Sequence, residues 1–227
     1  MSRSVVTRGT PRCSHCQFAP RWCVCAGLRP VPCPLPVAIL LHRRESRRPT
    51  STGRLLQRVV PSARTHLYTP DAPPSRERVL HPGCEPWILH PQGEPVPAGA
   101  QASTTQVILL DGNWREASRM LRRIESWGRP VALPAESSSR YRLRNQHADG
   151  MYSTAETLIL LLEHLGLGQP ASELRLQFEL HVYAGLRSRG AIREAEEFLA
   201  ASPLPAAMPE ILDQLHRRRP NLEALRP

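Results

Sequence analysis

The chain has 227 residues and a formal net charge of +10, and its 41% hydrophobic and 22% charged residues exclude wholesale disorder and collagen-like structure. Its longest aliphatic runs, residues 37–41 and 158–162, are far shorter than the about 20 apolar residues that a membrane span needs. Because residues 1–12 are polar and basic, we expect no secretory signal, no membrane partner and a cytoplasmic location.

Four cysteines crowd together near the N-terminus: Cys13, Cys16, Cys23 and Cys25. In a chain without an export signal, such a cluster is more typical of a metal site than of disulfides, and four thiolates satisfy tetrahedral Zn²⁺. His15 or Cys33 could replace one ligand, and free thiols at a disordered end are the alternative. We therefore predict a cysteine-rich zinc-binding segment over residues 1–36 and a second domain over residues 37–227.

The apolar run at residues 37–41 has the length of a buried strand. A polar loop over residues 42–54 follows, and Thr52 can N-cap a helix over residues 53–60. α/β proteins place anion and ligand contacts where a buried strand ends and a helix begins. The arginines of this loop therefore either bind an anion or are solvated: Arg43, Arg44, Arg47, Arg48 and Arg54.

Two further strands are predicted at residues 86–90 and 106–110, with loops rich in Pro and small residues at 70–78 and 91–105. The second of these strands ends at Asp111-Gly112-Asn113-Trp114, and a helix follows at once. Its apolar residues share one face: Ala117, Met120, Leu121 and Ile124. Its arginines lie largely away from that face and meet solvent or phosphate: Arg115, Arg119, Arg122 and Arg123.

A short strand at residues 130–134 leads into the segment Ser139-x-Tyr141-x-Leu143-Arg144, and a loop is predicted at residues 145–152. Ser153-x-x-Glu156 has the spacing of a capping box, so Glu156 has a structural as well as a functional explanation. The helix that begins here reaches about residue 165. Because it is apolar nearly all round, we expect it to be buried centrally.

The rest of the chain, residues 172–225, has a helical and polar pattern, with breaks expected at residues 185–190 and 202–205.

All 30 basic residues of the chain are arginines. GC-rich coding can replace Lys by Arg, but it does not create a net excess of positive charge. Guanidinium groups bind phosphate through two hydrogen bonds and stack on bases, so the charge favours a nucleic-acid partner. The predicted RNA contacts are Arg43, Arg44, Arg47, Arg48, Arg54, Arg115, Arg119 and Arg122.

The order of these motifs resembles that of the DTW-domain proteins. The shared features are the motif that starts at Asp111, the segment that starts at Ser139 and the helix start at Ser153, all behind an N-terminal cysteine cluster. The resemblance covers the chain from Cys13 to about Leu165. The chain departs from the family pattern at Asn113, where the family has Thr, and at the following positions: Arg43, Met151 and Thr157.

Characterised DTW-domain proteins are tRNA-uridine aminocarboxypropyltransferases. The resemblance therefore implies a SPOUT-like α/β sheet whose C-terminal part forms a trefoil knot that binds S-adenosylmethionine. It also implies transfer of the 3-amino-3-carboxypropyl group to N3 of a uridine in tRNA, with release of methylthioadenosine. In this reading, residues 37–227 are the catalytic domain, with helices at its C-terminal end.

This reaction needs a base close to the N3 proton, and Asp111, at the end of a buried strand, is the best candidate. Arg144 or Arg54 would suit the carboxylate of the co-substrate, and Trp114 and Tyr141 could stack on adenine or uracil. The predicted S-adenosylmethionine site comprises Leu110, Asp111, Gly112, Trp114, Leu133, Ser139, Tyr141, Leu143, Arg144, Ser153, Thr154 and Glu156.

Two alternatives stay open. A SPOUT-type RNA methyltransferase would use the same co-substrate but leave S-adenosylhomocysteine. A non-catalytic, zinc-containing RNA-binding module would use the basic surface alone. The sequence also leaves open the oligomeric state, the tRNA and the uridine position.

Overall fold

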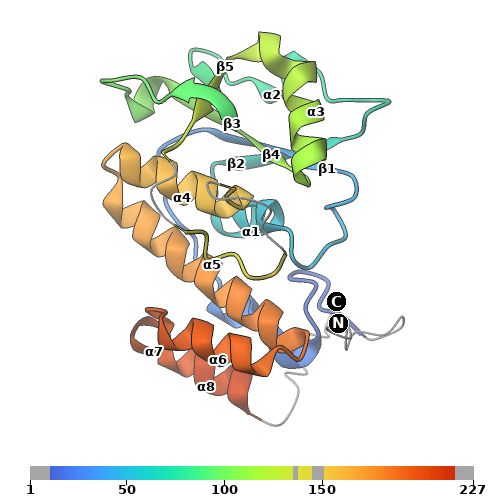
Figure 1. The fold of residues 1–227 in the computed structure, drawn as a ribbon, viewed down its shortest axis with the longest axis vertical. Helices are drawn as coiled ribbons and strands as arrows, with labels where there is room; N and C mark the ends of the chain where they lie inside the picture. The colour runs from blue at the N-terminus through green and yellow to red at the C-terminus, as the bar shows by residue number, and fades with distance from the viewer. Residues whose placement is uncertain (1–10, 135–137, 145–150, 218–227) are drawn as a thin grey trace.

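A computed structural model describes residues 11–134, 138–144 and 151–217. Its centre is a sheet of five parallel strands in the order β2-β1-β4-β3-β5 (Figure 1). The strands are β1 (Val37–His42), β2 (Ala63–Tyr68), β3 (Glu85–Pro95), β4 (Thr105–Asp111) and β5 (Arg129–Ala132). The predicted mixed α/β architecture is therefore confirmed.

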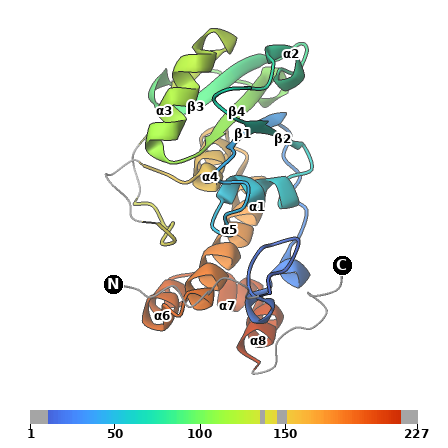
Figure 2. The same cartoon turned by 90° about the vertical axis from the view of Figure 1, so that its right-hand side faces the viewer.

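Both faces of the sheet are covered, as the nearly continuous apolar runs of β1 and β4 require. Along β1, Val37, Ile39 and Leu41 belong to one buried cluster, whereas Ala38 and Leu40 belong to the other. Helices α1 (Thr52–Val59) and α4 (Thr154–His164) pack on the first face, and α5 (Gly168–Ser188) packs against these two helices. Helix α3 (Trp114–Ile124) packs on the second face (Figure 2), and Val79 of α2 (Arg76–Val79) belongs to the same buried cluster.

Short 3₁₀ turns and small helices complete the described chain. The turns are η1 (Pro20–Trp22), η2 (Cys25–Gly27), η3 (Ala102–Thr104) and η4 (Glu125–Trp127). The C-terminal helices are α6 (Ile192–Ala200), α7 (Leu204–Ala207) and α8 (Pro209–His216), at the end of the molecule far from the sheet (Figure 1). Among the described residues, no helix is long and apolar enough to cross a bilayer.

The N-terminal segment, residues 11–36, packs against α5. The ring centroids of Phe18 and His181 are 5.0 Å apart, and the Arg29 amide donates to Oε1 of Gln177 at 3.1 Å. A Cβ on Gly27 would lie 2.8 Å from the Leu180 side chain, so a larger residue at this position would displace that side chain. Three of the clustered cysteines share a buried cluster with strand residues. The domain boundary after residue 36 stays a prediction.

Several local expectations need correction. The N-cap of α1 is Ser51 and not Thr52, because the Ser51 hydroxyl accepts from the Arg54 amide at 3.2 Å. β3 continues to Pro95, into the loop expected at residues 91–105, and α2 forms inside the loop expected at residues 70–78. Of the predicted loop at residues 145–152, positions 145–150 lie outside the described residues, as do positions 135–137 and 218–225.

Gly185 was expected to break the C-terminal helical region, but it lies inside α5. A Cβ at this position would come within 2.6 Å of the Leu143 side chain. Glycine is therefore explained by close packing and not by a turn. α5 ends at Ser188, so the break itself lies within the predicted range of residues 185–190.

Candidate functional site

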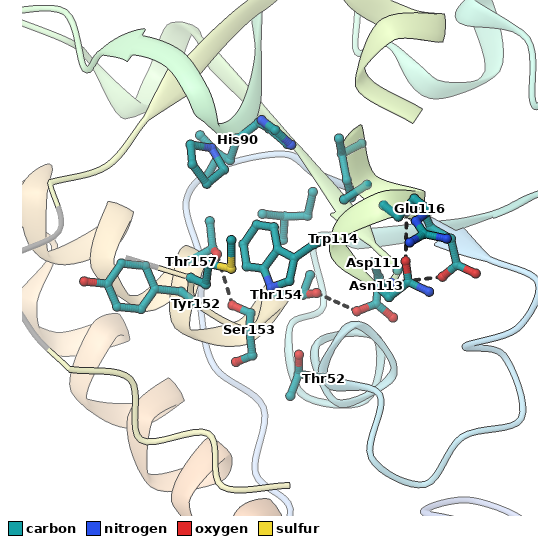
Figure 3. A pocket seen from close by; sticks show the side chains of 18 of the residues that line it. Thr52, His90, Asp111, Asn113, Trp114, Glu116, Tyr152, Ser153, Thr154 and Thr157 are labelled. Atoms are coloured by element: carbon teal, nitrogen blue, oxygen red, sulfur yellow. Dashed lines mark hydrogen bonds between the residues drawn. The ribbon is translucent and has the colours of Figure 1, made fainter. Parts of the chain in front are cut away.

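A cavity of about 860 Å³ opens at the carboxyl ends of β4 and β5, between the N-termini of α3 and α4 (Figure 3). Its volume lies in the range of small-molecule sites, and open parallel sheets bind ligands at this edge. β3 contributes residues from the place where its pairing with β5 shifts register, between Leu89 and Glu94. Nine predicted co-substrate residues line the cavity: Leu110, Asp111, Gly112, Trp114, Leu133, Tyr141, Arg144, Ser153 and Thr154.

Three other predicted residues, Ser139, Leu143 and Glu156, are buried but do not line the cavity. The Glu156 carboxylate accepts hydrogen bonds from the Ser139 hydroxyl at 2.8 Å and from the Arg140 amide at 2.7 Å. It also accepts from the Ser153 amide at 2.9 Å, which completes the predicted capping box. Glu156 therefore ties the segment 138–144 to the start of α4.

Asp111 is 5% exposed and is held by two neighbouring elements. Oδ2 accepts from the Ser51 hydroxyl at 2.7 Å, and Oδ1 accepts from the Gly53 amide at 3.4 Å and from the Thr154 hydroxyl. The N-cap of α3 is Asn113, whose side chain accepts from the Glu116 amide. Helix N-termini carry partial positive charge, and the starts of α1 and α4 both lie against the Asp111 carboxylate.

Arg144 and Tyr141 join the cavity wall to the loop between β1 and α1. The Arg144 guanidinium pairs with the fully buried Glu45 carboxylate, and the Tyr141 hydroxyl donates to the Thr50 carbonyl at 2.6 Å. Burial raises the pKa of Tyr141 to about 12, so its hydroxyl stays a donor. Arg54 bonds to the Ser46 carbonyl and does not line the cavity. The carboxylate-binding role predicted for Arg144 or Arg54 stays a prediction.

Sequence reasoning missed several residues of the wall, among them His90, Glu116, Met151 and Tyr152. His90 is buried, its Nδ1 accepts from the Gln92 amide at 3.2 Å, and burial lowers its pKa, so the ring is neutral at pH 7. Its place at the end of a predicted strand could have revealed it, since such ends gather at one edge of the sheet. For Glu116 the signal is different: the Asn113-x-x-Glu116 spacing is that of a capping box and could have placed Glu116 at the start of the helix.

The predicted RNA-binding arginines lie on two elements. Arg43, Arg44, Arg47 and Arg48 are exposed on the loop between β1 and α1, and Arg44 pairs with Glu116 at 3.3 Å. On α3, exposed side chains project from Arg115, Arg119, Arg122 and Arg123. Three of these residues also line the cavity: Arg44, Arg115 and Arg119. The cavity therefore has guanidinium groups from both elements at its wall.

The four clustered cysteines bring their sulfur atoms together. The Sγ atoms of Cys13 and Cys25 are 3.6 Å apart, those of Cys16 and Cys23 are 3.7 Å apart, and all four lie within 4.8 Å of one another. A tetrahedral zinc with Zn–S bonds of about 2.3 Å separates its sulfurs by about 3.8 Å. The neighbouring thiols lower the pKa of Cys16, which favours a thiolate there. Among the described residues, neither His15 nor Cys33 joins this group.

Comparison with protein families matches the DTW domain over residues 10–185. The match includes the cysteine cluster, the five-stranded sheet and all the described residues that line the cavity. A search of solved structures finds no match to this chain. Since the match spans more than half of its length and agrees with the order of motifs, the chain belongs to the DTW-domain family.

Proposed function

We propose that this protein transfers the 3-amino-3-carboxypropyl group of S-adenosylmethionine to N3 of a uridine in tRNA and releases methylthioadenosine. The observation that carries the proposal is the cavity at the carboxyl ends of the strands, with Asp111 and four arginines on its wall. DTW-family membership, which is consistent with tRNA modification, supports the same reaction class. In this proposal the protein acts in the cytoplasm.

The residues of the cavity suit S-adenosylmethionine in size and in chemistry. The cavity has room for a ligand of this size together with a nucleobase, and its wall combines apolar and charged side chains. Trp114 and Tyr152 offer aromatic surface to adenine or uracil, and Figure 3 shows the Trp114 ring between the starts of α3 and α4. When bound, S-adenosylmethionine supplies the electrophilic carbon next to its sulfonium.

The protein's part in the proposed reaction is orientation and proton removal. Uridine N3 attacks only after it loses its proton, so an acceptor must lie within hydrogen-bond distance of it. Asp111 is the proposed acceptor, since its carboxylate lies on the wall beside Trp114. Holding the correct carbon, and not the methyl group, in line with N3 decides which group is transferred.

We further propose a fold relationship to the SPOUT methyltransferases, including a trefoil knot in the C-terminal part. The parallel sheet supports this relationship, as does a site shared between the strand ends and the later segments 138–144 and 151–157. The cysteine cluster is proposed to hold one structural zinc ion through Cys13, Cys16, Cys23 and Cys25, because their sulfur spacing suits a tetrahedral ion.

The by-product of the reaction distinguishes the proposal from its nearest alternative. Incubation of the protein with S-adenosylmethionine and unmodified tRNA should give methylthioadenosine and a uridine that is heavier by one aminocarboxypropyl group. Mass spectrometry of the digested nucleosides and of the small-molecule fraction measures both. S-adenosylhomocysteine as the sole by-product would show a methyltransferase, and tRNA binding without either by-product would show a non-catalytic RNA-binding module.

The arginines of α3 provide a separate test of the RNA partner. We expect the double variant Arg119→Glu, Arg122→Glu to bind tRNA about tenfold more weakly or worse, with a salt dependence flatter by about 1 to 2 in log–log slope. Both side chains are exposed, so the fold should not change. Filter binding or fluorescence anisotropy at several salt concentrations gives the slope.

A matched control reverses two arginines elsewhere. Arg76 and Arg78 are exposed on α2, near the amino ends of the strands. The double variant Arg76→Glu, Arg78→Glu changes the net charge by the same amount as the α3 double variant. It should lose less tRNA affinity, and its log–log salt dependence should be flattened less. If the two double variants bind tRNA alike, the α3 arginines act only through net charge.

A further inference from the structure

The Asp111 carboxylate lies at a meeting point of β4, α1 and α4. A carboxylate has about four acceptor sites, two on each oxygen. On Oδ1, both sites are used, by the Gly53 amide at 3.4 Å and by the Thr154 hydroxyl. On Oδ2, one site is used, by the Ser51 hydroxyl at 2.7 Å. The described residues therefore leave one acceptor site open, and it is on Oδ2.

The groups that donate to Asp111 are themselves fixed. The Ser51 hydroxyl accepts from the Arg54 amide as the N-cap of α1, so its own proton is directed elsewhere, to Asp111. Thr154 is the first residue of α4, whose start is held by the capping box of Ser153 and Glu156. Figure 3 shows Thr154 reaching from this helix start toward Asp111.

Close packing prevents the carboxylate from turning. A Cβ added to Gly53 would lie 2.7 Å from Cγ and 2.8 Å from Oδ2 of Asp111, so the carboxylate lies directly against the backbone of α1. Asp111 is also buried. A carboxylate held in this way presents the same oxygen and the same lone pair at every encounter with substrate.

We propose that Ser51 and Thr154 are positioning residues that lock the Asp111 carboxylate so that the open site on Oδ2 receives the N3 proton of the uridine. This inference rests on the proposed function. The proton moves from N3 to Oδ2, and the electron pair of the N–H bond stays on N3, which becomes the nucleophile. Without the two hydroxyl donors, the carboxylate samples other orientations and the proton transfer is less often in line.

The direct test compares two changes at Thr154. Thr154→Val keeps the shape but removes the donor, and we expect kcat to fall about 10- to 100-fold with KM changed less than about threefold. Thr154→Ser restores the hydroxyl and should return kcat to within about threefold of the unmodified protein. If Thr154→Val keeps its kcat, or if Thr154→Ser fails to restore it, the inference is wrong.

A matched control lies at the other end of the same strand. Thr105 is buried at the start of β4, and its hydroxyl donates to the Gln101 carbonyl at 2.8 Å. Thr105→Val makes the same chemical change without touching the cavity or Asp111. It should leave kcat unchanged, which separates the specific loss from the general cost of removing a buried hydroxyl.

A double-mutant cycle asks whether Thr154 acts through Asp111. In an Asp111→Asn background, Thr154→Val should lower kcat by no more than about twofold, because the group that it positions no longer accepts a proton. If the fold-decrease in kcat of the double variant equals the product of the two single decreases, Thr154 acts independently of Asp111 and the inference is wrong.

Hydrogen exchange tests the same contact without substrate. In Thr154→Val we expect the Gly53 amide to exchange about tenfold faster than in the unmodified protein, because its acceptor on Asp111 is no longer fixed. Unchanged exchange at Gly53 would overturn the inference even if the unmodified enzyme forms product. Conversely, if the Gly53 amide exchanges faster in Thr154→Val but the unmodified protein forms no methylthioadenosine, Thr154 does position Asp111 and the proposed function is wrong.

Discussion

Replacing Cys16 with Ser is expected to abolish binding of the proposed zinc ion and to loosen the N-terminal segment from α5. Cys16 is fully buried, and its sulfur lies 3.7 Å from that of Cys23. Structural zinc sites contribute folding free energy directly, so losing a ligand removes several kcal/mol. For a chain of this size we expect the melting temperature to fall by about 10 °C. Calorimetry measures this shift, and metal analysis should find about one zinc per unmodified chain.

Two other cysteines serve as matched controls for Cys16→Ser. Cys33 and Cys84 are partly buried and lie outside the sulfur cluster. Cys33→Ser and Cys84→Ser should therefore keep the metal and most of the stability. Freshly purified protein without any transition metal would contradict the prediction, and loss of metal in Cys33→Ser would make Cys33 a ligand. S-adenosylmethionine binding should survive Cys16→Ser, because none of residues 11–36 lines the cavity.

Periodicity and caps were enough to predict three of the helices that cover the sheet, α1, α3 and α4. The apolar run of β4 is a local pattern that predicts burial on both faces, and the stripe of α3 is a local pattern that predicts burial on one face; Ile108 of β4 lies in the same buried cluster as the α3 stripe. Other features depend on partners that are distant in the sequence. The extension of β3 to Pro95 depends on its register shift against β5, and Gly185 depends on the position of Leu143.

The same distinction holds for the candidate site. Strand ends and motifs placed Asp111, Trp114 and Thr154 on the wall, because the carboxyl ends of parallel strands share one edge. Sequence spacing could not reveal that Ser51 bonds to Asp111 across 60 positions. Nor could it reveal that Arg144 already pairs with Glu45 across 99 positions. Residue type indicates what a side chain can do, whereas its availability depends on these tertiary contacts.

Asp111→Asn is the change expected to reduce turnover most. The amide oxygen of Asn can still accept from Gly53 and Thr154, and the Ser51 hydroxyl can turn to accept from the new NH₂ group. The fold and the cavity wall are therefore retained, but the open acceptor site on Oδ2 is lost. We expect turnover to fall by about 10²-fold or more, the usual scale for removing a general base. Product formation measured by mass spectrometry gives the rate.

Asp111→Ala cannot serve for this test, because it removes every hydrogen bond that joins β4 to α1 and α4 through this side chain. Asp213→Asn is the matched control, since Asp213 is exposed on α8 and pairs only weakly with Arg217 at 3.0 Å. It should leave turnover, melting temperature and tRNA affinity unchanged. Near-normal turnover in Asp111→Asn, with co-substrate and tRNA still bound, would mean that the N3 proton leaves by another route. The carboxylate would then only join the three elements that form the cavity wall.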